Sequence, residues 1–103
     1  MTLLQWYSNM TSDAEKRLQQ KYLQKLPEKL SEIQGFYQQQ DRTSFQSAVH
    51  KLAGSAGMYG FEELSKISSE LEDMIVSDES LKSDKTQTLF EELQKTIKQI
   101  IQS

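Results

Sequence analysis

The sequence predicts an all-α protein, an antiparallel four-helix bundle with a short additional helix at its N-terminus. Apolar residues recur three or four positions apart through four segments of the 103-residue chain. No segment shows the alternation of apolar and polar residues that is typical of a half-buried strand. The segments are separated by short connections, and the length suits one domain over residues 1–103.

The short additional helix is expected over residues 3–9. Thr2 and Gln5 have the spacing of a capping box, in which the two side chains satisfy backbone N–H groups at a helix start. An N-terminal helix that packs across the bundle explains the apolar content of this segment. That content is Leu3, Leu4, Trp6 and Tyr7.

A long helix is expected over about residues 13–39. Ser12 and Glu15 repeat the capping-box spacing. The apolar stripe keeps its phase across Pro27, the only proline, so a kink within one helix is favoured over a restart. The stripe consists of Leu18, Tyr22, Leu26, Leu30, Ile33 and Tyr37.

Three more helices are expected in the rest of the chain. Asp41 is the predicted N-cap of the first, which ends among the glycines at 57–60. The second extends from Phe61 to Ile75 and is followed by a polar loop at 77–85. Asp84 suits the start of the last. The last helix has an apolar face of Leu89, Leu93, Ile97 and Ile100, widened by Phe90 and Ile101.

Composition excludes several classes of function. The net charge is −3, with Lys and Arg interleaved among Asp and Glu, so no basic surface for nucleic acid is expected. The chain has no cysteine, which excludes disulfides and thiol chemistry. No apolar stretch approaches the roughly 20 residues that a membrane span requires. We expect a soluble, cytoplasmic protein, and a monomer if one face is functional.

The stretch HKLAGSAGMYG, residues 50–60, holds the only histidine and three of the four glycines. A glycine inside a helix costs about 0.5–1 kcal/mol relative to alanine, so two of them beside a histidine call for an explanation. With Leu52 at the centre of the buried face, His50 lies about 160° away, on the solvent side. Gly54 and Gly57 share that side, and Gln46 lies one turn earlier. The pattern indicates an uncovered imidazole that another protein approaches closely.

These residues resemble the motif of the histidine phosphotransfer (HPt) domain, His-x-Leu-x-Gly-Ser-Ala followed by a further glycine. The resemblance extends upstream through QDRTSFQSAV and downstream through FEELSKISSELEDMI. It implies a four-helix bundle without an ATP or metal site. It also implies that His50 takes a phosphoryl group from a receiver-domain aspartate, of a hybrid sensor kinase or a response regulator, and gives it to another receiver. Gly54 matches the glycine that lets the receiver dock.

The resemblance has further implications for chemistry. The chain would be a phosphoryl carrier without kinase activity, needing no cofactor, while the partner receiver brings Mg²⁺. Many family members carry a lysine three residues after the histidine, and here that position is Ala53. Lys51 lies about 100° around the helix from His50, and its long stem brings the ammonium group partway towards a phosphate.

The properties of histidine suit phosphoryl transfer independently of the family resemblance. Imidazole titrates near neutrality, so a ring nitrogen with a free lone pair is available without a dedicated base. A helical hairpin that turns near 58–60 places residues 68–72 opposite His50. Ser69 and Glu72 are therefore candidates to accept a hydrogen bond from the other ring nitrogen, with plain surface charge as the competing interpretation of Glu72.

Other interpretations stay open at this point. Gly57 suits close packing as well as access, and Gln46 suits an ordinary surface position. For the whole chain, the alternative is a non-catalytic helical adaptor that binds receiver or other signalling proteins without phosphotransfer. A hydrolytic or metal-dependent enzyme ranks last, because one histidine and no cysteine supply neither a metal site nor a nucleophile with its base.

Overall fold

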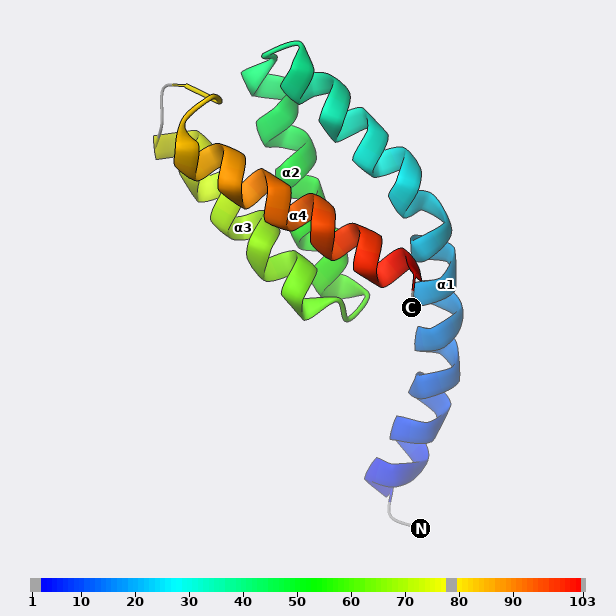
Figure 1. Ribbon diagram of the computed structural model, residues 1–103. Helices are drawn as coiled ribbons and strands as arrows, with labels where there is room; N and C mark the ends of the chain where they lie inside the picture. The colour runs from blue at the N-terminus through cyan, green and yellow to red at the C-terminus, as the bar shows by residue number, and fades with distance from the viewer. Residues whose placement is uncertain (1–2, 78–79, 103) are drawn as a thin grey trace.

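The computed structural model describes the backbone of residues 3–77 and 80–102, and side chains from residue 13 onward within those ranges. It contains four helices, which are α1 (Leu3–Gln38), α2 (Arg42–Met58), α3 (Glu62–Ser77) and α4 (Asp84–Gln102), and the described residues form no strand. Successive helices run in opposite directions (Figure 1). The predicted antiparallel four-helix bundle is thus confirmed.

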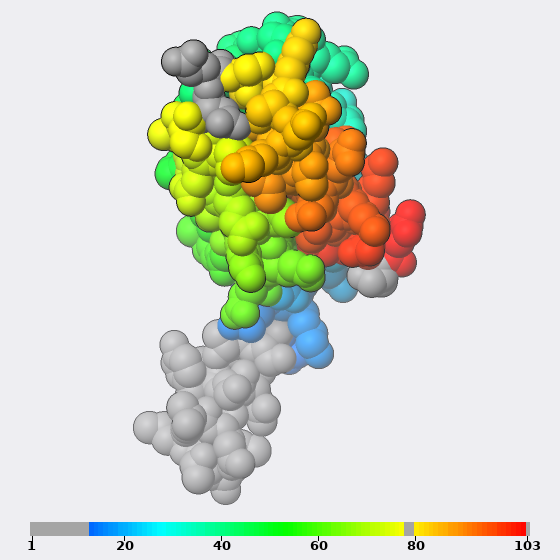
Figure 2. Space-filling model, turned by 60° about the vertical axis from the view of Figure 1, so that its left-hand side comes forward, coloured from blue at the N-terminus to red at the C-terminus, as the bar shows by residue number. Residues whose placement is uncertain are grey.

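The helices pack in a ring in chain order. α2 lies against α3, α3 against α4, and α1 closes the ring by contacting both α2 and α4. Figure 2 shows α3 and α4 side by side on one face of the molecule. This arrangement gives α2 two neighbours, α1 on one side and α3 on the other, and leaves its remaining face to solvent.

The predicted opening helix is not a separate element. Residues 3–9 are helical, but they are the first part of α1, which is continuous from Leu3 to Gln38. Ser12 suits an N-cap, yet residues 9–12 contain neither glycine nor proline, so nothing in them prevents a helix that has already started from continuing. The packing expected of Trp6 and Tyr7 lies outside the described side chains.

Pro27 lies inside α1, as the unbroken phase of the stripe predicted. Pro27 is exposed, whereas Leu26 and Leu30 are buried, so the proline ring lies on the solvent side of α1. α1 changes direction between its blue and cyan parts (Figure 1). The helix therefore bends and keeps one apolar stripe facing the bundle.

The core joins all four helices. Phe45 of α2 is fully buried, and its ring centroid lies 5.3 Å from that of Tyr37 and 5.2 Å from that of Phe90. These rings come from three different helices, so aromatic packing ties α1, α2 and α4 together. The other large side chains without exposed surface are Leu26, Leu64, Leu71, Ile75, Leu93, Ile97 and Val49.

The turn between α2 and α3 sets the position of the histidine helix. Gly60 has φ +86°, a left-handed conformation that side chains rarely adopt. The Phe61 N–H donates to the Ala56 carbonyl over 2.8 Å, and the Gly60 N–H donates to the Gly57 carbonyl over 3.2 Å. This pattern closes the end of α2 and reverses the chain, so α3 runs back along α2.

Two side chains hold the opposite end of α2. The carboxylate of Asp41 accepts a hydrogen bond from the Ser44 N–H over 3.2 Å, which confirms the predicted N-cap. The Arg42 guanidinium donates to the carbonyl of Ile75 near the end of α3. Because the last carbonyls of a helix lack intrahelical donors, this contact fastens the start of α2 to the end of α3.

Ser68 is fully buried in α3, and its hydroxyl has no hydrogen-bond partner within the described part of the chain. Burying a hydroxyl without a partner costs about 1–3 kcal/mol. We therefore expect Ser68→Ala to raise the free energy of unfolding by about 1 kcal/mol, measured by urea denaturation. A loss of stability in this variant would show that the hydroxyl is satisfied in solution.

Candidate functional site

His50 lies in the middle of α2 on its solvent face. Its side chain is 72% exposed, whereas Val49 and Leu52 of the same helix are buried. The helical period thus places the ring outside the core, as the sequence predicted. The buried neighbours hold the backbone of His50 in a helix that cannot rotate without exposing them, so the exposed ring stands on a rigid base.

Glu72 of α3 holds one side of the ring. Nδ1 of His50 lies 3.0 Å from Oε1 and 2.8 Å from Oε2 of the carboxylate. A carboxylate only accepts, so Nδ1 carries the hydrogen and, in the neutral ring, Nε2 carries the free lone pair. Among the described residues, no hydrogen bond to Nε2 is found. Ser69, the other predicted candidate, is exposed and makes no hydrogen bond to the ring.

The two glycines near His50 have different surroundings. A Cβ placed on Gly54 meets no heavy atom within 4 Å, so this position opens to solvent beside the ring. A Cβ on Gly57 lies only 3.1 Å from the Ser65 hydroxyl oxygen of α3. The contact with Ser65 therefore supports close packing, one of the two interpretations of Gly57, although Gly57 itself is exposed. Gly54 is the position with open space around an added Cβ.

Ala53, at the position where the resemblance expects a lysine, faces α3. The residue is 8% exposed, and its carbonyl accepts a hydrogen bond from the Ser65 hydroxyl over 2.8 Å. Lys51 is exposed on the opposite flank of α2, and Gln46 is partly buried one turn before His50. The structure thus brings Glu72 to the ring and places Gly54 beside it, while Lys51 and Gln46 make no hydrogen bond to it.

A hydrogen-bond chain that the sequence did not indicate links α1 to the motif. Ser55 donates to the Leu52 carbonyl over 3.3 Å, and the Tyr22 hydroxyl lies 2.7 Å from the Ser55 oxygen. Burial raises the pKa of Tyr22 above its usual value. Because Ser55 donates its own hydrogen to Leu52, the Tyr22 hydroxyl donates to the Ser55 oxygen. The serine of the motif therefore anchors the histidine helix and does not face a partner.

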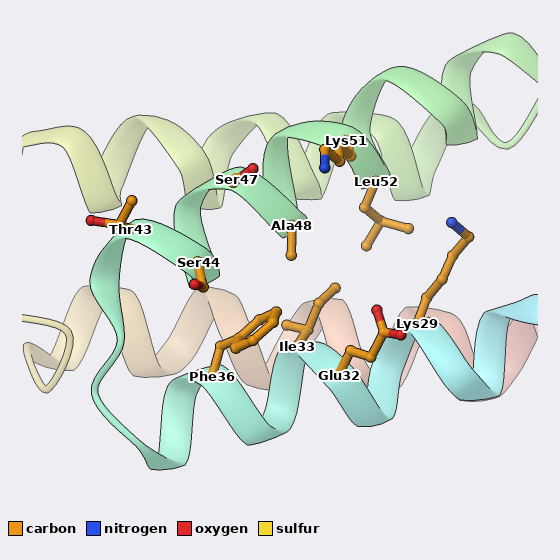
Figure 3. Close-up of a pocket in the computed structure, with 10 residues that line it drawn as sticks. All are labelled: Lys29, Glu32, Ile33, Phe36, Thr43, Ser44, Ser47, Ala48, Lys51 and Leu52. Carbon is orange, nitrogen blue, oxygen red and sulfur yellow. The ribbon is translucent and has the colours of Figure 1, made fainter.

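A groove of about 420 Å³ lies between α1 and α2 (Figure 3). Ile33, Phe36, Ala48 and Leu52 supply its apolar walls. Polar and charged side chains line the rest, namely Lys29, Glu32, Thr43, Ser44, Ser47 and Lys51. The residues from α1 were not predictable as part of this groove, because only the packing of α1 against α2 brings them beside the histidine helix.

Other kinds of site are not found in the described part of the chain. No three acidic or histidine side chains there cluster in a way that would hold a metal ion. None of the helices, within the same residues, combines the length and apolar character needed to cross a membrane.

Fold and site together define a helical bundle that presents one exposed imidazole on a rigid helix. Comparison with protein families matches residues 17–103 to the Hpt domain, which covers most of the chain. The protein belongs to the Hpt domain family, whose members serve phosphotransfer in two-component systems and interact with receiver domains. Comparisons with curated proteins and with solved structures give no match.

Proposed function

We propose that His50 accepts a phosphoryl group on Nε2 from a receiver-domain aspartate and passes it to a second receiver. The observation that carries this proposal is the state of the ring: 72% exposed, held at Nδ1 by Glu72, with Nε2 directed away from that contact. A nucleophile for phosphoryl transfer needs a free lone pair in a fixed place, and this arrangement supplies both.

The transfer step is simple in this site. The Nε2 lone pair attacks phosphorus, the bond from phosphorus to the aspartyl oxygen breaks, and its electron pair leaves with the carboxylate. The proton on Nδ1 stays on the ring beside Glu72. The receiver supplies the aspartate and Mg²⁺, so this chain acts as a carrier without kinase activity and without a cofactor of its own.

The receiver docks on the open face of α2. Gly54 leaves free space beside the ring, and the groove between α1 and α2 offers apolar contact area on the flank of α2 that faces α1. The lining of that groove holds two lysines, Lys29 and Lys51, and one acid, Glu32, so its net positive charge suits a partner whose pocket is acidic. One such face serves donor and acceptor in turn, so we propose that the protein works as a cytoplasmic monomer.

The test is incubation with a receiver domain that carries labelled phosphoryl. We expect the label to appear on the wild-type chain in an acid-labile, base-stable form, as for a phosphoramidate, and to be absent from His50→Gln. Circular dichroism checks that the variant keeps its helices. Binding of the receiver without any transfer of label would contradict phosphotransfer and favour the adaptor alternative.

A further inference from the structure

A negative charge lies directly against His50, the residue proposed to carry the phosphoryl group. Both oxygens of Glu72 lie within 3.0 Å of Nδ1, so a negative charge abuts the ring. At the position where many Hpt domains carry a lysine, three residues after the histidine, this chain has Ala53, which is nearly buried. Lys51 is next to His50 along α2 and Asp73 is next to Glu72 along α3, and both are exposed.

We propose that Glu72 makes phosphorylated His50 short-lived and quick to pass its group on. This inference rests on the proposed phosphotransfer function and adds a role for Glu72 in the second half of the cycle. Glu72 is a positioning residue, because it acts through the ring and does not touch phosphorus.

Phosphorylated His50 is short-lived because Glu72 makes its imidazole ring a better leaving group. After Nε2 has bonded to phosphorus, the ring that keeps its Nδ1 proton is a cation, which the Glu72 carboxylate stabilises through the contact of 2.8 Å. When the bond from Nε2 to phosphorus breaks, its electron pair returns to Nε2 and the ring leaves as neutral imidazole. A ring that has lost the proton must leave as an imidazolate anion, which is a far poorer leaving group. Glu72 therefore holds the ring in the form that releases the phosphoryl group.

Electrostatic repulsion between the phosphoryl group and the Glu72 carboxylate also favours loss of the phosphoryl group. The phosphoryl group is an anion on the same five-membered ring as the nitrogen that Glu72 contacts, and like charges repel at that range. No hydrogen bond or ion pair joins Lys51 to the ring or to Glu72 in the described structure. The phosphorylated state thus gains little local compensation, and its release to an aspartate or to water is favoured.

The experiment compares wild type with Glu72→Gln, which keeps an oxygen acceptor and removes the charge. Each protein is phosphorylated with phosphoramidate, the donor is removed, and loss of the phosphoryl group is followed by ³¹P NMR. We expect the half-life in Glu72→Gln to lengthen about fivefold, the difference between a charged and a neutral hydrogen-bond acceptor. Asp73→Asn is the matched control, since it removes the same charge one residue away, and its half-life should equal that of wild type.

A second readout separates this role from a merely structural one. Hydrolysis of the wild-type phosphoryl group should slow as pH rises and the ring proton is lost, and in Glu72→Gln that fall should begin at lower pH. Equal half-lives and equal pH profiles for wild type and Glu72→Gln would overturn the inference while leaving His50 as the phosphorylated residue. A wild-type chain that takes no label on His50 would overturn both proposals.

Discussion

Gly54→Leu is expected to lower the rate of phosphoryl transfer from a receiver about a hundredfold, which corresponds to roughly 2.7 kcal/mol. Gly54 has nothing within 4 Å of an added Cβ, so a leucine at this position starts from open space in the free protein. Its side chain then occupies the space that a receiver needs to reach the ring. The measurement is the single-turnover rate of label transfer from a phosphorylated receiver.

The stability of Gly54→Leu should stay equal to wild type or rise by up to about 1 kcal/mol, because leucine is the better helix former. Labelling by phosphoramidate, a donor too small to meet the leucine, should continue. Gly35→Leu is the matched control: Gly35 also has open space around an added Cβ, but it lies in α1. Wild-type transfer by Gly54→Leu would refute the claim that Gly54 provides access.

Phe45→Ala is expected to lower the free energy of unfolding by about 3–5 kcal/mol. The ring is fully buried and packs against Tyr37 and Phe90, so its removal leaves a cavity where three helices meet. The total free energy of unfolding of a small domain is only about 5–15 kcal/mol, so this one substitution removes a large share of the stability. Urea denaturation followed by circular dichroism measures the loss.

The control for this variant is Met58→Ala. Met58 is 78% exposed at the end of α2, so its truncation should change stability by less than about 0.5 kcal/mol. A loss below about 1 kcal/mol in Phe45→Ala would mean that the aromatic contacts contribute little beyond what the remaining core provides.

Much of the fold follows from local patterns. The boundaries of α2 were predictable because Asp41 caps its start and the glycines at 57–60 end it. The exposure of His50 followed from the helical period alone, since one residue in the core at Leu52 determines the direction of all its neighbours. The continuity of α1 was not predictable, because Ser12 carries a capping signal that the helix overrides.

The contacts around His50 could not be predicted from local sequence patterns alone. The sequence placed Glu72 among several residues opposite His50, but only the side-by-side position of α2 and α3 puts its carboxylate on Nδ1. The same packing separates the two glycines: Gly57 meets Ser65 of α3 and Gly54 meets nothing. A rotation of α3 by a fraction of a turn would change both contacts without altering any helix.

By itself, the sequence determined that the chain forms amphipathic helices and that its single histidine faces outward, because helical periodicity is a property of neighbouring residues. Tertiary structure decided what surrounds that histidine: the Glu72 carboxylate, the close approach at Gly57 and the groove lined by α1. These features join residues more than one helix apart in the chain, and their distances depend on how the whole core packs, which no local pattern specifies.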